Sequence, residues 1–320
     1  MTSTRIRTLA AAAAVAALTA GLAACGPDES AGGKAKAAAS AAPAAISRVP
    51  EAAQPPAAVT PAAFLQQVGD KSSAQKSAKA VEVIKTQTGQ ITSQGAMSWA
   101  NGLTGSMTMQ LPSAVAGKLG TSGAADVVYQ ADAMYVNMHL PQSMLSQMGG
   151  KHWFRYSYDD LAKVMGPAGD SLKDGLKNAD PVATVRAAIA SGKVTEVGKE
   201  SLNGAQVTHY AADLTLAQMS GQGTSLTQDQ IDAVRQQLKS QGITSAHYDV
   251  WVDGQGLLVK QETKSQSANG PIDVTVSYSD YGTQVTATPP PAEDTMDAAQ
   301  LLAQAAKQLG QPGQTQPAAD

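Results

Sequence analysis

The stretch from His247 to Ser279 restricts the fold of this 320-residue chain most, because its side chains alternate between apolar and polar. His247 to Val252 and Ile272 to Ser279 follow a period of two, which is the period of a β-strand with one buried face. Asp253-Gly254 separates the first run from Leu257 to Lys264, and this dipeptide is typical of a tight hairpin turn. The pattern predicts three consecutive antiparallel strands.

Shorter runs of the same kind predict further strands earlier in the chain. Asn203-Gly204, which tolerates the positive φ angles of a tight turn, joins two of them, and Asp132-Ala133 lies between two others. The predicted strands are Ala78 to Ile84, Ser106 to Leu111, Val127 to Tyr129, Met134 to Met138, Lys151 to Tyr158, Val194 to Glu200 and Ala205 to Leu214. Their number and order favour one long antiparallel sheet.

Helical patterns interrupt the strands at a few places. Thr60-Pro61, an N-cap residue followed by proline, begins a short helix that ends at Gly69, and Asp180-Pro181 begins a second helix. Thr227 to Gln230 forms the capping box of a third helix, and Thr295 to Leu309 has helical spacing as well. The first three carry narrow apolar stripes, so we expect them to lie against one face of the sheet. The predicted fold class is α+β and mostly β.

The first 25 residues form a processing signal. Arg5 and Arg7 provide positive charge, and the apolar stretch from Leu9 to Ala20 is too short to cross a bilayer as a helix. It leads into Leu22-Ala23-Ala24-Cys25, which resembles a bacterial lipobox. Cleavage before Cys25, the single cysteine of the chain, leaves its thiol to carry a diacylglyceryl group. The alternatives are an ordinary signal peptide cut after Ala24 with a free thiol beside its cleavage site, or a buried N-terminal apolar helix.

Composition divides the rest of the chain into a tether, a domain and a tail. Residues 31–63 contain 15 Ala and five Pro, which bury too little apolar surface to offset the entropy of ordering them. All 13 aromatic residues lie between Phe64 and Tyr281. The predicted segments are a signal peptide over 1–24, a lipidated cysteine and disordered tether over 25–63, one globular domain over 64–291, and a C-terminal tail over 292–320.

Charge and cysteine content exclude two classes of protein. The formal net charge of −3 argues against nucleic acid as a partner, because phosphate binding draws on a surplus of Lys and Arg. One cysteine excludes an intrachain disulfide framework and a thiolate-based structural zinc site.

Catalytic motifs are scarce. Ser73 and Lys76 match the S-x-x-K pair of serine β-lactamases, but no K-T-G follows, and an exposed polar turn is the simpler interpretation. His209 and His247 on neighbouring strands, with Asp249, supply residue types that bind metals, although strand histidines more often face solvent. We therefore predict no enzyme, no cofactor and no resident metal.

Several segments resemble a known family. Tyr129 to Val136, Lys151 to Phe154, Tyr248 to Gly254, Gly256 to Leu258 and Tyr281-Gly282, together with the lipobox and tether, resemble the LppX/LprA/LprF/LprG lipoproteins of actinobacteria. The resemblance covers roughly residues 64 to 291. It implies a LolA-like fold: a curved antiparallel half-barrel whose concave face is covered by helices around an apolar cavity.

The resemblance also implies a function. Members of that family carry lipids or lipoglycans through the envelope, so we expect an extracytoplasmic carrier. Its lipid anchor would hold it on the outer face of the cytoplasmic membrane, where it exchanges ligand with a membrane or an envelope transporter. The predicted lining of the acyl-chain cavity consists of Met107, Met109, Val250, Val252, Val274 and Val276. The alternative is a non-enzymatic interaction or sensing module with a filled core, and the cavity volume distinguishes the two.

Overall fold

The computed structural model describes residues 59–146, 149–165, 181–190, 193–217 and 242–299, with a few positions between them (173, 232, 235–236 and 238–239). Within these residues, twelve strands form one sheet. The strands are β1 (Ser77–Thr86), β2 (Gly89–Ser98), β3 (Thr104–Gln110), β4 (Ala124–Tyr129), β5 (Ala133–Asn137), β6 (Trp153–Ser157), β7 (Thr195–Leu202), β8 (Ala205–Thr215), β9 (Ser245–Asp253), β10 (Leu258–Ser267), β11 (Gly270–Ser279) and β12 (Thr295–Asp297). The fold is mostly β, as the alternation predicts.

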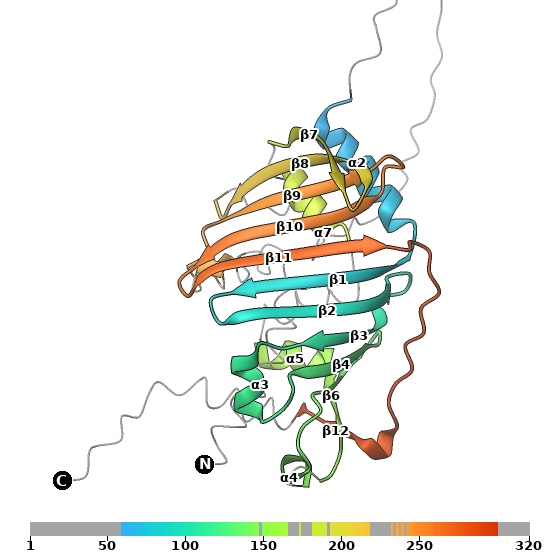
Figure 1. The fold of residues 1–320 in the computed structure, drawn as a ribbon, viewed down its shortest axis with the longest axis vertical. Helices are drawn as coiled ribbons and strands as arrows, with labels where there is room; N and C mark the ends of the chain where they lie inside the picture. The colour runs from blue at the N-terminus through green and yellow to red at the C-terminus, as the bar shows by residue number, and fades with distance from the viewer. Residues whose placement is uncertain are drawn as a thin grey trace, which may run out of the picture.

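The sheet consists of two meanders. Strands β1 to β6 follow one another across one half and β7 to β11 across the other, giving the order β12-β6-β5-β4-β3-β2-β1-β11-β10-β9-β8-β7. The halves meet where β1 pairs antiparallel with β11, with Ala80 opposite Tyr278. Figure 1 shows the sheet open and curved, from β7 at the top to β6 and β12 at the bottom.

Glycines permit close backbone approach between β2 and β3. Gly95 lies opposite Met107, and Gly105 lies opposite Met97. A Cβ atom at either glycine would overlap a main-chain oxygen of the facing strand, so only glycine fits. Glycine kinks of this kind let a sheet bend sharply.

Two helices pack against the β8–β11 half of the sheet. Helix α2 (Pro61–Ser73) begins where the sequence predicts, and the Thr60 hydroxyl accepts a hydrogen bond from Ala63 N at 3.2 Å. It continues past the predicted end at Gly69, because this residue lies against Val182, just before helix α7 (Ala183–Ala190). A small residue there lets the two segments approach.

Three short helices at the other half were not predicted: α3 (Ser113–Leu119), α4 (Gln142–Leu145) and α5 (Tyr158–Met165). Of the predicted helix after Thr227, the structure describes only residues 232, 235–236 and 238–239, and all of these are helical. The predicted start of a helix at Thr295 is wrong: Thr295–Asp297 form strand β12, which pairs parallel with β6, and residues 300–309 of that prediction lie outside the described residues. The sheet therefore extends beyond residue 291, where the sequence placed the end of the domain.

Residues 280–294, here called the strap, connect β11 to β12. Figure 1 shows this orange-red segment running past the ends of the intervening strands. Ser77 Oγ donates a 2.6 Å hydrogen bond to Thr283 O, and Gln130 Nε2 donates one of 2.6 Å to Ala287 O. At the far end, His152 N and His152 Nδ1 both lie within hydrogen-bonding distance of Asp294 Oδ1. The strap thereby joins the two meanders a second time.

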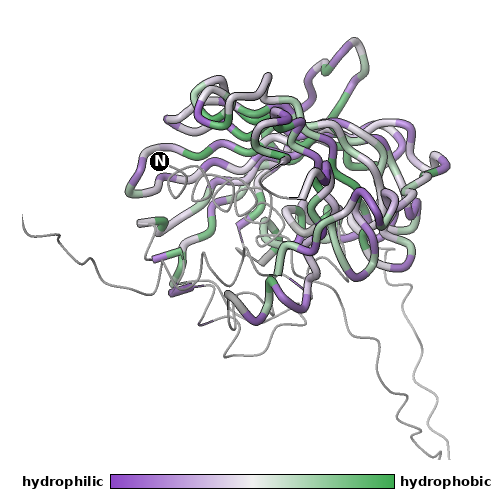
Figure 2. The backbone as a smooth tube through the Cα atoms, turned by 90° about the horizontal axis from the view of Figure 1, so that it is seen from below, coloured by the Kyte–Doolittle hydropathy of each residue, from purple (hydrophilic) through white to green (hydrophobic). Residues whose placement is uncertain are grey.

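The core has two main parts, both on the helix-bearing face of the sheet. Cluster 1, at the β3–β6 end, contains Leu111, Leu119, Met134, Met138, Leu140, Met144, Leu145, Phe154, Tyr156, Tyr158, Leu161 and Ala298. Cluster 2, below α2 and α7, contains Leu65, Val68, Ala78, Ala80, Val182, Val185, Tyr210, Val250, Val252, Leu258 and Tyr278. Figure 2 shows hydrophobic and hydrophilic positions interspersed along the strands, as expected when one face is covered.

Candidate functional site

The strand register places all six predicted lining residues on one face of the sheet, here called the inner face. Met107 is opposite Gly95, which is opposite Ala80, and Ala80 is opposite Tyr278. Residues paired directly across strands share a face, and alternate residues along a strand share it too. The same rule assigns Met109, Val250, Val252, Val274 and Val276 to the inner face.

Burial divides these six residues into two groups. Met107, Val250 and Val252 are buried, and the two valines belong to cluster 2. Met109, Val274 and Val276 are half-buried. The first group therefore fills the core, and only the second has surface left to offer a ligand.

A half-buried apolar strip lies between the two clusters. Ile91 of β2 and Ile272 and Val274 of β11 point to the inner face and keep part of their surface exposed. Glu82 of β1 lies among them, opposite Val276 of β11. Burial, and secondarily the charge of Glu82, raises the pKa of the Tyr129 phenol. The strip is apolar with one carboxylate.

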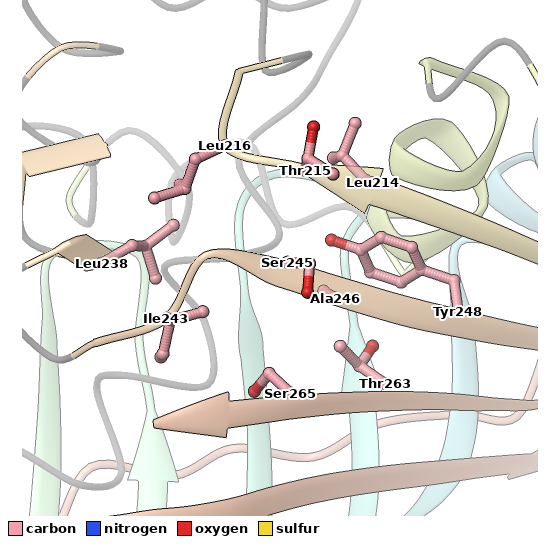
Figure 3. Close-up of a pocket in the computed structure, with 10 residues that line it drawn as sticks. All are labelled: Leu214, Thr215, Leu216, Leu238, Ile243, Ser245, Ala246, Tyr248, Thr263 and Ser265. Carbon is pink, nitrogen blue, oxygen red and sulfur yellow. The ribbon is translucent and has the colours of Figure 1, made fainter. Parts of the chain in front are cut away.

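A small cavity among the described residues lies at the β8–β10 end of the inner face. Its volume is about 30 Å³, which holds about two water-sized groups and not an acyl chain. Figure 3 shows the hydroxyl-bearing Thr263 and Ser265 of β10 beside apolar walls. The lining residues are Leu214, Thr215, Leu216, Leu238, Ile243, Ser245, Ala246, Tyr248, Thr263 and Ser265.

A polar side chain that sequence reasoning missed also faces inward. Gln261 of β10 lies between Val250 and Val276 and is 8% exposed. Its Nε2 donates to Tyr278 Oη at 3.2 Å, and Tyr278 Oη donates to Pro181 O at 3.2 Å. Gln261 and Thr263 are two residues apart on the predicted strand, so they share one face of the sheet. This spacing was the available indication that Gln261 lies on the same face as Thr263.

The opposite face, here called the outer face, carries a stack across three strands. His209, Trp251 and Lys260 lie opposite one another on β8, β9 and β10. The His209 and Trp251 rings stack with centroids 4.5 Å apart, and Lys260 Nζ lies 4.0 Å from the Trp251 ring centroid. Glu200 accepts a hydrogen bond from Trp251 Nε1. The indole is thus covered on an otherwise polar face.

Asp249 lies beside this stack and is contacted by three basic groups. Its Oδ1 is 2.8 Å from His209 Nε2 and 3.3 Å from His247 Nε2, and its Oδ2 is 3.2 Å from Lys264 Nζ. Burial alone would raise the pKa of Asp249, but hydrogen bonds from His209 and Lys264 hold it below its usual value. A hydrogen bond to Asp213 raises the pKa of His247.

The structure therefore brings His209, His247 and Asp249 together, as their strand positions allow. They form a network of ion pairs and hydrogen bonds on the outer face. In the part of the chain that the structure describes, no three His, Cys, Asp or Glu residues are arranged to hold a metal ion.

Ser73 is the last residue of α2, and Lys76 lies in the turn that joins α2 to β1. The main-chain oxygen of Ser73 accepts hydrogen bonds from Lys76 N at 3.2 Å and from Trp99 Nε1 at 2.9 Å. Lys76 is exposed and has a φ of 65°. This local geometry supports the interpretation as a polar turn.

The fold and the inner face define a class of protein. Its members are built on one large curved sheet whose inner face is mainly apolar. A 31.2 kDa protein of Streptomyces griseus, encoded in the rplA–rplJ intergenic region and described as uncharacterised, is 37% identical over 252 residues, 77% of this chain and 81% of that protein. The chain belongs to the same family as this protein. SCO4650 of Streptomyces coelicolor, whose name marks it as a proposed lipoprotein, is 32% identical over 213 residues, 65% of each chain.

Solved structures with similarity to this chain include two mycobacterial lipoproteins. LprF of Mycobacterium bovis is 14% identical with a TM-score of 0.44, over 72% of this chain and 97% of that one. LppX of Mycobacterium tuberculosis is 11% identical with a TM-score of 0.43, over 71% and 97%. Both names belong to the group that the sequence resembles. No family model matches the sequence. Among the described residues, no helix has the length and apolar character needed to span a membrane.

Proposed function

We propose that this protein is a lipid-anchored extracytoplasmic lipoprotein that binds acyl chains of lipids or lipoglycans on its inner face and carries them between membrane sites. The observation that carries the proposal is the half-buried apolar strip of Ile91, Ile272 and Val274 between two filled clusters. An apolar strip of this kind gains free energy when a hydrocarbon chain covers it. In this proposal the inner face is the concave side of a LolA-like half-barrel, covered in part by α2 and α7.

The small cavity sets a condition on the mechanism. At about 30 Å³ the described cavity is far below the volume of an acyl chain. The acyl chain is therefore proposed to lie on the half-buried strip between cluster 1 and cluster 2, and not in this cavity. The head group stays in water, and no step of the proposed function breaks a covalent bond, so the protein acts as a carrier and not as an enzyme.

The anchor is the second part of the proposal. The lipobox ending at Cys25 and the lipoprotein name of the S. coelicolor relative support a diacylglyceryl thioether at this residue. Acyl chains at Cys25 would hold the protein at the membrane, because each buried methylene contributes about 0.8 kcal/mol. Intact mass spectrometry of the membrane form tests the modification. An unmodified thiol at the mature N-terminus would contradict it.

Native mass spectrometry with lipid extraction tests the carrier function on the full mature chain from an actinobacterial host. We expect a stoichiometric lipid in the wild type. Val274→Thr keeps the side-chain shape and adds a hydroxyl to the apolar strip, so lipid occupancy should fall about fivefold. Val81→Thr is the matched control, because Val81 is 42% exposed on the outer face of the neighbouring strand.

A second candidate function is favoured by the small cavity. A protein with a filled core acts as an interaction or sensing module in the envelope, without a lipid ligand. A clean mass for wild type and both variants, unchanged after incubation with host lipids, supports this module and rules out the carrier.

A further inference from the structure

Gln261 is a polar amide in an apolar position. It lies opposite Val250 on one side and Val276 on the other, and both valines face inward. With 8% of its surface exposed, Gln261 is removed from water almost as completely as the neighbouring core. A leucine would pack here without any polar atom to satisfy.

The hydrogen bonds around Gln261 fix the orientation of its amide. Tyr278 Oη donates its single proton to Pro181 O, so it acts as an acceptor toward Gln261. Gln261 Nε2 is the donor that meets it, at 3.2 Å. The amide oxygen consequently points away from Tyr278. Gln261 Oε1 is buried and has no hydrogen-bond partner.

The inner-face positions that follow Gln261 along β10 are also polar. Thr263 and Ser265 line the small cavity together with leucine and isoleucine side chains (Figure 3). A buried acceptor without a donor is destabilising, and a hydrocarbon laid over it leaves that acceptor unsatisfied. A ligand that complements this part of the inner face therefore carries a hydrogen-bond donor along its acyl chain, and not only in its head group.

We propose that the ligand is an amphiphile whose acyl chain bears a hydroxyl group, and that this hydroxyl donates a hydrogen bond to Gln261 Oε1. This inference rests on the proposed function and specifies the chemical class of its ligand. A hydroxyl is neutral, so it enters an apolar face at lower cost than an ammonium group. The hydrocarbon beside the hydroxyl then packs on the half-buried Val276 and Val274 of the neighbouring strand.

A competition experiment tests this ligand class. The full mature chain in detergent micelles is incubated, in separate runs, with equimolar stearate and one hydroxystearate that bears its hydroxyl at C3, C10 or C12, and native mass spectrometry resolves the two complexes of each run by the mass of one oxygen. Wild type should favour one hydroxystearate over stearate by about tenfold, the effect of satisfying one buried acceptor. Gln261→Met, which keeps an unbranched side chain of similar length, should bind both acids equally.

Gln266→Met is the matched control, because it makes the same change on the exposed outer face of the same strand. This variant should keep the wild-type preference. If Gln261→Met fails to fold, Gln261→Leu replaces it. Equal binding of the two acids by wild type, or a preference that persists without Gln261, overturns the inference while the carrier function stands. Absence of binding by either acid overturns the carrier function and the inference together.

Discussion

Gly95 of β2 lies so close to Ser106 of β3 that a Cβ atom at position 95 would overlap the Ser106 carbonyl oxygen. The same Cβ would lie 2.8 Å from the Cα atom of Met107. Backbone, and not a flexible side chain, is the obstacle. The two strands therefore depend on glycine at this contact.

Gly95→Ala should lower the free energy of unfolding by about 1–3 kcal/mol, because the strands must separate to admit a methyl group. Urea denaturation of the mature chain measures it. Gly117→Ala is the control, because no atom lies within 4 Å of a Cβ at that position of α3. Alanine there should stabilise by about 0.5–1 kcal/mol. Equal stability of Gly95→Ala and wild type would show that β2 and β3 do not approach this closely.

Tyr158→Phe should leave the protein as stable as wild type or make it more stable by up to about 1 kcal/mol. The Tyr158 hydroxyl is buried and has no hydrogen-bond partner, so its removal relieves a desolvation cost. Tyr281→Phe makes the same change where Oη donates to Leu258 O at 2.5 Å, and it should cost about 1 kcal/mol. Thermal unfolding of both variants checks the contrast. A loss in Tyr158→Phe that equals the loss in Tyr281→Phe would contradict it.

The pairing of His247 with Asp213 predicts a pH dependence of stability. Hydrogen bonding to Asp213 at 2.8 Å raises the pKa of His247 in the folded state. A raised pKa means that the imidazolium stabilises the fold below the pKa of the unfolded state, and this contribution disappears as pH rises through the folded pKa. The difference in unfolding free energy between wild type and His247→Gln should therefore be larger at pH 5.5 than at pH 8.

The expected change is about 0.2–1 kcal/mol, because both side chains are partly exposed. Lys79→Gln serves as the control, since its 2.8 Å ion pair with Asp280 contains no imidazole. A wild-type advantage over His247→Gln that grows toward pH 8 would reverse the sign and refute the assignment.

We expect Asp294 to fix the C-terminal end of the strap against His152, just before β6. It accepts hydrogen bonds from the His152 ring and backbone, and these bonds lower the pKa of the Asp294 carboxyl. Asp294→Ala should speed amide hydrogen exchange in Thr295–Asp297, whose strand follows directly. Glu293→Ala, at the exposed neighbouring position, should not. In wild type the protection should fall as pH drops through the lowered pKa, because protonation removes the charged acceptor.

The sequence predicts most strands, and the exceptions have physical causes. Strand β11 alternates cleanly, because every inner position between Ile272 and Tyr278 is apolar. Strand β2 was missed, since Ser93 and Gly95 occupy two of its inner positions and remove the alternation. Close backbone contact requires glycine at the second of these. Strand β12 is three residues long and depends on the strap for its position, so no local pattern marks it.

The sequence predicts which residues share the inner face, but it does not predict which of them are buried or that Gln261 lies among them. Period-two alternation is sufficient to put Met107, Val250 and Val276 on one side of a sheet. It does not show which of them pack into a closed cluster, since that depends on helices from distant parts of the chain. Gln261 escaped notice because it lies between Lys260 and Glu262, in a polar stretch where no alternation marks an inward-facing position.

The pairing of β1 with β11 has a consequence for how the protein is made. These strands form the centre of the sheet, although they come from near the beginning and the end of the described residues. Contacts so distant along the chain slow folding, because a long loop must close before they form. During synthesis, the β1–β2 hairpin emerges with one edge unpaired and waits for β11 to arrive. This edge of β1 therefore stays open to wrong pairing for the time that translation of the intervening residues takes.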